Sequence, residues 1–515
     1  MSILARLALP LLRLKDRRTP TPESMREAQD RIRARLVSDF ARLPVGHARG
    51  LDQLPLDGRL RDAFRIQVPL ARYEDYLPLL ERVARNEPDV MFPGRATALA
   101  ITSGTTSGGH AGERFIPQSK GLLTHHQAGG AAAFVRLADW VGPELLGGKL
   151  LLMGGSTDLK ANAHGVPAGD LSGIIVSLIP TLLWRLYEPG RDIALMGDWE
   201  QKLAAMTGRV SRADLRLASG IGSWLLTLFA ACCRERGVER AQQVWPRLRA
   251  VIHGGHAMEP LIGQFQHHLP GDTWMQEVYP ASEAFIAIGQ KPWRLGDGTV
   301  SVMELLCDHG VLLEFCPDDD PRAEACVGPE ALEAGRVYRV TITTPGGLVR
   351  WQMGDLVRGE GPGLIRFAGR TKTRISVFGE HVEGDLLAAA LATACAATGA
   401  RIRHSHVAPV LPKPGEQCGA HEWLVQPEPG SAFDVAAFAA AIDGHLRAHS
   451  ADYDAHRIVQ LTAPVITVLP DGAVERWLEA KGKLGGQHKV PQAWPDRTIA
   501  EQIVASLPQG SGVRG

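Results

Sequence analysis

The CxxC motif is absent from this sequence. Its seven cysteines are scattered over 515 residues, and none forms a CxxC pair. This pattern argues against a zinc site. The odd count predicts free, mostly packed thiols in a reducing compartment. His253 and His256 come nearest to a metal-binding spacing, but they stand in a Gly-rich turn, and we expect no metal site there.

Excess charge and long apolar runs are also absent. Lys plus Arg equals Asp plus Glu at 56 each, so no basic surplus supports a nucleic-acid partner. No stretch reaches the roughly 18 apolar residues of a membrane span. Arg6 and Pro10 interrupt the apolar N-terminus, and no cleavage site follows. We therefore expect a cytoplasmic protein, and its length predicts two or more domains.

Small residues are abundant at one place. Residues 102–109, TSGTTSGG, are all Gly, Ser or Thr, and they follow an apolar, strand-like approach. Small residues let backbone N–H groups converge on one point, which suits a phosphate cradle. The Walker spacing GxxxxGK[ST] is missing. A flexible linker is the alternative, but linkers seldom follow directly on a buried strand.

The rest of the pattern predicts an α/β protein. An Ala-rich helix is expected over 122–137. Short apolar strands at 149–153 and 248–252 run into turns, and residues 274–283 read as another strand that runs into a polar turn. Residues 66–92 read as a strand leading to a helix. Residues 337–367 read as an antiparallel meander, and an α+β tail with a helix over 384–397 follows.

Five motifs in order carry a family resemblance. They are TSGTTSG at 102–108, YPASE at 279–283, WQMGD at 351–355, GRTKTRISVFGEHVE at 369–383 and QHKVP at 487–491. From about residue 20 to about residue 500, the chain resembles the bacterial acyl-acid amido synthetases of the Gretchen Hagen family. These belong to the adenylate-forming superfamily, with acyl-CoA synthetases, luciferases and adenylation domains.

The resemblance implies a domain plan. Residues 1–369 would form a large ATP- and acyl-binding domain of α/β sheets with an antiparallel β subdomain. Residues 370–505 would form a smaller, mobile α+β lid, with Lys372 at the hinge, and 506–515 a disordered tail. A solvated lysine on a turn is the alternative for Lys372. We expect a monomer.

The resemblance also implies a nucleotide site. Its ATP-binding residues would be Thr102, Ser103, Gly104, Thr105, Thr106, Ser107, Gly108, Arg114, Tyr279, Asp355 and Arg370. The chain departs from the family at 109–112, which lengthen the loop, and at Arg114, where a lysine is common. Arginine keeps the charge and adds a planar fork.

Individual roles follow from the same resemblance. Tyr279 would flank the adenine, Ser282 would contact the α-phosphate or the acyl carboxylate, and Glu283 would hold Mg²⁺. Asp355 would accept hydrogen bonds from both ribose hydroxyls. An ordinary strand end and an ordinary turn are the alternatives for YPASE and Asp355. Lys489 would stabilise charge on the α-phosphate, with Lys481 and Lys483 as competitors.

The acyl pocket is assigned by family position alone. Its residues would be Ser223, Trp224, His253, Gly254 and Gly255. For Trp224, at the head of an apolar helix, core packing is the commoner explanation.

The implied activity is a two-step ligation. A small carboxylic acid would attack ATP to give an acyl-adenylate and pyrophosphate, and an amine, expected to be an amino acid, would then displace AMP. One alternative is an acyl-CoA ligase of the same superfamily. Another is a nucleotide-binding homologue that has lost catalysis, which the longer phosphate loop would favour.

Overall fold

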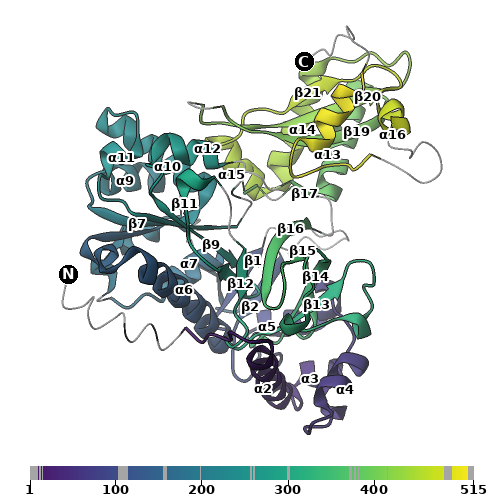
Figure 1. Cartoon of the computed structure of the whole chain (residues 1–515). Helices are drawn as coiled ribbons and strands as arrows, with labels where there is room; N and C mark the ends of the chain where they lie inside the picture. Colours follow the sequence, from purple (N-terminus) through teal and green to yellow (C-terminus); the bar gives the residue numbers. More distant parts are fainter. Residues whose placement is uncertain are drawn as a thin grey trace. The chain divides into compact units, whose positions relative to one another are not determined.

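The structure is a computed structural model that describes most of the chain. The described residues are 10, 13, 16–102, 114–154, 159–181, 183–197, 199–255, 258, 261–298, 302–370, 374–375, 379–380, 382–413, 416–480 and 490–507. The first of two compact units comprises Met1–Thr102 and Phe115–Thr371, and the second lies mainly within Lys372–Gly515. Both units mix helices and strands (Figure 1), which confirms the expected α/β class. None of the helices in these ranges is long and apolar enough to cross a membrane.

A large mixed sheet organises the first unit, and twelve described strands form it. Its parallel part runs β6 (Tyr187–Glu188), β3 (Lys149–Leu152), β7 (Leu215–Ile221), β8 (Ala250–Gly254) and β9 (Trp274–Pro280). Its antiparallel part continues through β10 (Phe285–Gly289), β12 (Met303–Leu305), β16 (Leu364–Arg370), β15 (Trp351–Gly359), β14 (Val337–Thr343) and β13 (Leu312–Pro317). β11 (Trp293–Arg294) pairs with β9. The sheet therefore includes the expected antiparallel meander.

A smaller sheet holds the strand that leads to the Gly/Ser/Thr stretch. Its order is β2 (Arg114–Gln118), β1 (Ala98–Thr102), β5 (Pro167–Gly169) and β4 (Lys160–Ala161). β1 and β5 are parallel. The chain leaves β2 directly into α6 (Lys120–Val141), whose first turn is capped by Ser119. The strand before the stretch and the helix expected over 122–137 are therefore present, but an additional strand, β2, lies between the stretch and that helix.

Helices cover both faces of the parallel strands. The described α-helices of the first unit are α2 (Pro22–Phe40), α3 (Pro44–Ala48), α4 (Leu60–Gln67), α5 (Leu77–Ala84), α6, α7 (Leu171–Ser177), α8 (Arg191–Ala194), α9 (Trp199–Val210), α10 (Gly222–Arg236), α11 (Ala241–Val244) and α12 (Ile262–His268). On β8, Val251 packs in one core with α10 and α12, while Ala250 and Ile252 pack in another with α6. This alternation explains why the first three residues of β8, Ala250 to Ile252, are all apolar.

The N-terminal helices pack on the meander. Met25, Ile32, Leu36 and Phe40 of α2 are buried in one core with residues of β12 to β16, as their spacing predicts. The strand expected within 66–92 is wrong. The helix expected after it is confirmed as α5. The end of α4 and a 3₁₀ helix (Tyr73–Tyr76) come before α5, and the one described strand-like contact is an isolated bridge between Ala71 and Trp351.

The expectation of seven free cysteines is also wrong. Cys316 and Cys326 form a disulfide, with their Cα atoms 3.9 Å apart, while the other five cysteines are free. Val327 exchanges backbone hydrogen bonds with Phe315. This backbone pairing folds the chain back on β13 and brings the two cysteines together. Their separation of ten residues in the sequence does not by itself predict the disulfide.

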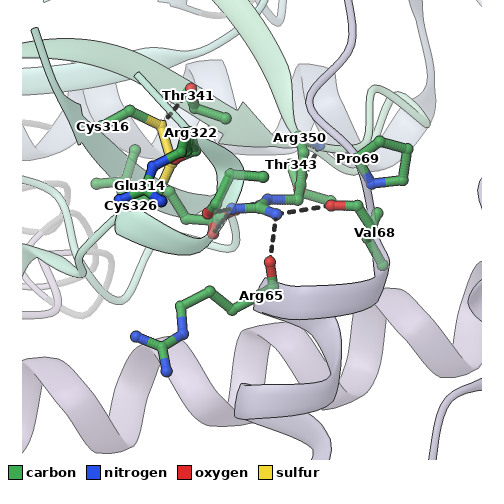
Figure 2. Close-up of polar contacts among 12 residues, drawn as sticks. Arg65, Val68, Pro69, Glu314, Cys316, Arg322, Cys326, Thr341, Thr343 and Arg350 are labelled. Carbon is green, nitrogen blue, oxygen red and sulfur yellow. Dashed lines mark hydrogen bonds and ion pairs between the residues drawn. A yellow bond between two sulfur atoms is a disulfide. The ribbon is translucent and has the colours of Figure 1, made fainter. Parts of the chain in front are cut away.

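A buried arginine fixes the turn that enters β15. Arg350 is fully buried and pairs with Glu314 of β13 at 3.0 Å (Figure 2). Its guanidinium also donates to the carbonyls of Arg65, Val68 and Ala323, at 2.9, 2.6 and 2.7 Å. The residue directly before the WQMGD motif is therefore tied to α4, to the residue that follows it and to the segment after β13.

Replacing Arg350 by methionine is expected to destabilise the first unit by about 3–5 kcal/mol, because it leaves Glu314 buried without its cation. Urea unfolding of the purified chain measures the loss. The double variant Arg350→Met, Glu314→Leu is the control, and it should recover part of the stability. A single variant within about 1 kcal/mol of the wild type would contradict this role.

The second unit is an α+β fold. Its strands are β17 (Arg374–Ile375) and β18 (Val382–Glu383), which pair, and β19 (Ile402–Val410), β20 (Ala420–Pro427) and β21 (Val465–Val468), which form a sheet in that order. Its helices are α13 (Gly384–Thr398), α14 (Val435–His449), α15 (Ala451–Val459), α16 (Ala473–Ala480) and α17 (Thr498–Ala505). α13 and α14 share one core with β19 and β20.

Glu380, which belongs to the motif at 369–383, forms a buried ion pair in the core of this unit. It pairs with His421 of β20 at 2.7 Å, and both side chains are fully buried. Burial raises the pKa of Glu380, but the hydrogen bond and charge of His421 outweigh it, so this pKa lies below its ordinary value. The pair holds the β17–β18 hairpin against the sheet.

Candidate active site

The residues expected to line the acyl pocket lie at the carboxyl ends of the parallel strands β7 and β8. Ile221 at the end of β7 pairs with Gly254 at the end of β8, and His253 pairs with Glu277 of β9. Ser223 follows β7 directly, in the first turn of α10. Ligands in α/β sheets bind at the carboxyl ends of such strands, so the location fits a binding site.

Several of these residues have packing roles. Trp224 packs against the core formed by α9, α10 and α12, in line with the alternative considered for it. His253 is only 1% exposed, and its ring stands edge-on to Trp293 at 6.2 Å. A Cβ on Gly254 would lie 2.4 Å from the Val278 carbonyl, so the close approach of β8 to β9 requires glycine there. Gly255, with φ +89°, turns the chain out of the strand.

The YPASE and WQMGD motifs meet through one short contact. The Tyr279 hydroxyl donates to Asp355 Oδ2 at 2.5 Å, across 76 residues of sequence. Asp355 is 2% exposed, and Gly354 before it has φ +81°, a conformation that favours glycine. Arg370, the last residue of β16, stands opposite Asp355 in the β15–β16 register. Three of the expected nucleotide residues are thus brought together in one unit.

An aromatic residue that the sequence did not single out completes this group. Phe367 of β16 stands edge-on to Tyr279, with ring centroids 6.1 Å apart, and it remains 43% exposed. A large exposed aromatic beside a buried carboxylate offers an apolar platform next to a hydrogen-bond acceptor. In the sequence, Phe367 could have been noticed only as an aromatic residue three positions before Arg370 in an expected strand.

The turn that carries Ser282 and Glu283 is tightly built. Ala281 N–H donates to the Ala284 carbonyl at 2.8 Å, and both candidate side chains are half-buried. Gln118 Nε2 donates to the Ser282 carbonyl at 3.0 Å. Among the residues that the structure describes, no group of three or more His, Cys, Asp or Glu could hold a metal ion. A metal here would need ligands from a substrate as well as from Glu283.

Other expected residues lie outside the described part of the chain. These are Ser103, Gly104, Thr105, Thr106, Ser107, Gly108, Lys372, Lys489 and the competitors Lys481 and Lys483. Thr102 and Arg114 bracket the Gly/Ser/Thr stretch, as the last residue of β1 and the first of β2. The roles of all these residues stay predictions.

Comparison with known proteins gives the family. The chain matches the GH3 family N-terminal domain over 46–220, the central domain over 304–370 and the C-terminal domain over 385–498. It is 24% identical to the putative indole-3-acetic acid-amido synthetase GH3.10 of Oryza sativa subsp. japonica over 366 residues, which are 64% of this chain and 74% of that protein.

Two solved structures share the fold. AtGH3.15 acyl acid amido synthetase in complex with 2,4-DB superposes with a TM-score of 0.60 at 16% identity, covering 99% of this chain and 98% of that one. A 2-hydroxyisobutyryl-CoA ligase has a TM-score of 0.55 at 13% identity, covering 94% and 92%. The matched family domains span about two thirds of the sequence, and the protein described here belongs to the GH3 family.

Proposed function

We propose that this protein is an ATP-dependent acyl-acid amido synthetase. It adenylates a small carboxylic acid and then transfers the acyl group to an amine of the amino-acid class, releasing AMP. The observation that carries the proposal is the contact between Tyr279 and Asp355, with Phe367 beside it. Family membership and the amido synthetases among the relatives support the reaction class.

The nucleotide would use three features of the first unit. Tyr279 and Phe367 offer ring faces and edges to the adenine, and Asp355 is a two-oxygen acceptor for the ribose hydroxyls. Residues 102–108 and Arg114 would receive the phosphates. Arg370, opposite Asp355, would contact the ribose or a phosphate.

Glu283 would hold Mg²⁺ together with the ATP phosphates. A site with one protein carboxylate fits this ion, which commonly keeps substrate oxygens and water as its other ligands. When bound, the ion would neutralise charge that develops on the phosphates. Ser282, one residue before, would contact the α-phosphate or the acyl carboxylate.

The second step needs an open path for the amine and good positioning. A mixed anhydride is already electrophilic, so orientation contributes more than strong base catalysis. In this account residues 1–369 bind ATP and acid, and residues 370–505 act as a lid that turns about Lys372 between the two steps. Ser223 and Gly255, at the ends of β7 and β8, would border the acid. Cytoplasmic location and a monomeric state stay predictions.

Acid-dependent exchange of labelled pyrophosphate into ATP tests the first step. A panel of aryl, indolyl and short aliphatic acids is added to the purified chain with ATP and Mg²⁺. At least one acid should raise the exchange rate clearly above the acid-free rate. Tight ATP binding with no exchange for any acid would contradict the proposal and would favour the inactive homologue.

A further inference from the structure

The Ser282–Glu283 turn is held from behind by two buried side chains outside the motifs. Gln118, fully buried at the end of β2, donates its Nε2 to the Ser282 carbonyl at 3.0 Å. His125 of α6 accepts the backbone N–H of Phe285 on its Nε2 at 2.9 Å. These contacts grip the turn on both sides of Glu283. Neither contacting side chain belongs to the five sequence motifs.

His125 can make its contacts in one protonation state only. Its Nδ1 lies 2.7 Å from the His309 carbonyl, which can only accept, so Nδ1 carries the hydrogen. Its Nε2 must then be unprotonated to accept from Phe285. Burial lowers the pKa of His125 to about 4, which keeps the ring neutral near pH 7. Burial also lowers the pKa of the adjacent His126 to about 3.

The geometry also links this turn to the strand after the Gly/Ser/Thr stretch. Gln118 ends β2, and Ser119, which follows it, donates its hydroxyl to the Pro345 carbonyl at 2.7 Å. The same short segment therefore touches the YPASE turn and the turn before β15. A shift of about 1 Å in a reacting group can lower a rate by about a hundredfold, so such anchoring matters for catalysis.

We propose that Gln118 and His125 are positioning residues that fix the Ser282–Glu283 turn for adenylation. This proposal rests on the proposed function. The two residues do not touch substrate in this account. They fix the position of the backbone from which the Ser282 and Glu283 side chains project. Gln118 does so by donating to the Ser282 carbonyl, and His125 by accepting the hydrogen bond from the Phe285 N–H.

Two amide substitutions at one position separate anchoring from general packing. His125→Gln places an acceptor near the position of Nε2 and can still receive the Phe285 N–H. His125→Asn reaches only the position of Nδ1, so it can keep the His309 contact but not the Phe285 contact. Hydrogen–deuterium exchange resolved to the Phe285 amide measures directly, without turnover, whether its hydrogen bond to His125 is kept. Pyrophosphate–ATP exchange measures the effect on the adenylation rate.

We expect the Phe285 amide to exchange about tenfold faster in His125→Asn than in the wild type, and the adenylation kcat to fall by about tenfold or more. The apparent Mg²⁺ requirement should rise, while KM for ATP changes little, because Asp355 and Phe367 are untouched. His125→Gln should recover most of both readouts. His268→Asn is the matched control, since His268 is a half-buried imidazole at the end of α12 whose ring contacts Phe229.

The proposal is overturned if His125→Asn leaves the Phe285 amide and kcat at wild-type values. It is also overturned if the Asn and Gln variants lose activity equally while the amide stays protected, since His125 would then act by packing alone. If the wild type catalyses no exchange with any acid, the proposed function fails. The Phe285 amide then decides the anchoring by itself.

Discussion

Asp355→Asn is expected to lower kcat/KM for ATP in the adenylation step by about a hundredfold. The carboxylate would accept hydrogen bonds from both ribose hydroxyls, and charge-assisted hydrogen bonds of this kind are worth about 1.5–3 kcal/mol each. The amide keeps one acceptor oxygen, so the contact with the Tyr279 hydroxyl can persist. Initial rates of pyrophosphate–ATP exchange over a range of ATP concentrations measure the effect.

Two further variants show which interaction is lost. Tyr279→Phe removes the hydroxyl that donates to Asp355 but keeps the ring, so its effect should be smaller, about tenfold or less. Asp319→Asn, on a carboxylate whose side chain is 73% exposed and paired with Arg336, should have no effect. A folded Asp355→Asn protein within about threefold of the wild type would remove Asp355 from the nucleotide site.

Lys489→Ala is expected to lower the adenylation rate by about 10²–10³-fold. An ammonium group placed near the α-phosphate stabilises charge that develops only in the transition state, and removing one such group typically has an effect of this size. The amide-forming step, started from a chemically prepared acyl-adenylate, should keep most of its rate. Single-turnover measurements of the two half-reactions separate these effects.

Lys481→Ala and Lys483→Ala are the matched controls, because each removes the same charge from the same short segment. Both should retain adenylation. If one of them shows the loss and Lys489→Ala does not, the assignment of the lysine is wrong. If none of the three changes the rate, no lysine of this segment serves the first step.

Local patterns predicted many of the helices and strands. Alternation along 337–367 gave the meander, and the apolar positions of α2 gave its buried face. Within 66–92 the expected helix is confirmed as α5, which buries Leu79, Leu80 and Val83, whereas the segment before it forms a 3₁₀ helix (Tyr73–Tyr76) instead of the expected strand. The periodicity of apolar residues within a short segment decides such predictions, whether they are right or wrong.

Contacts between distant segments could not be read from the sequence. Phe367 is one aromatic residue among thirteen Phe, and only its place beside Tyr279 gives it meaning. Gln118 and His125 bond backbone atoms more than 150 positions away, and backbone atoms leave no sequence pattern. The Cys316–Cys326 pair depends on the return of Val327 to β13, which no thiol spacing encodes.

The most direct test of the account is the identity of the acyl acceptor. The purified chain is incubated with ATP, Mg²⁺, an acid that supports pyrophosphate exchange, a mixture of amino acids, and coenzyme A, and the products are identified by mass spectrometry. The account predicts an amide of the acid with an amino acid, and AMP in equal amount. A coenzyme A thioester with no amide would contradict it.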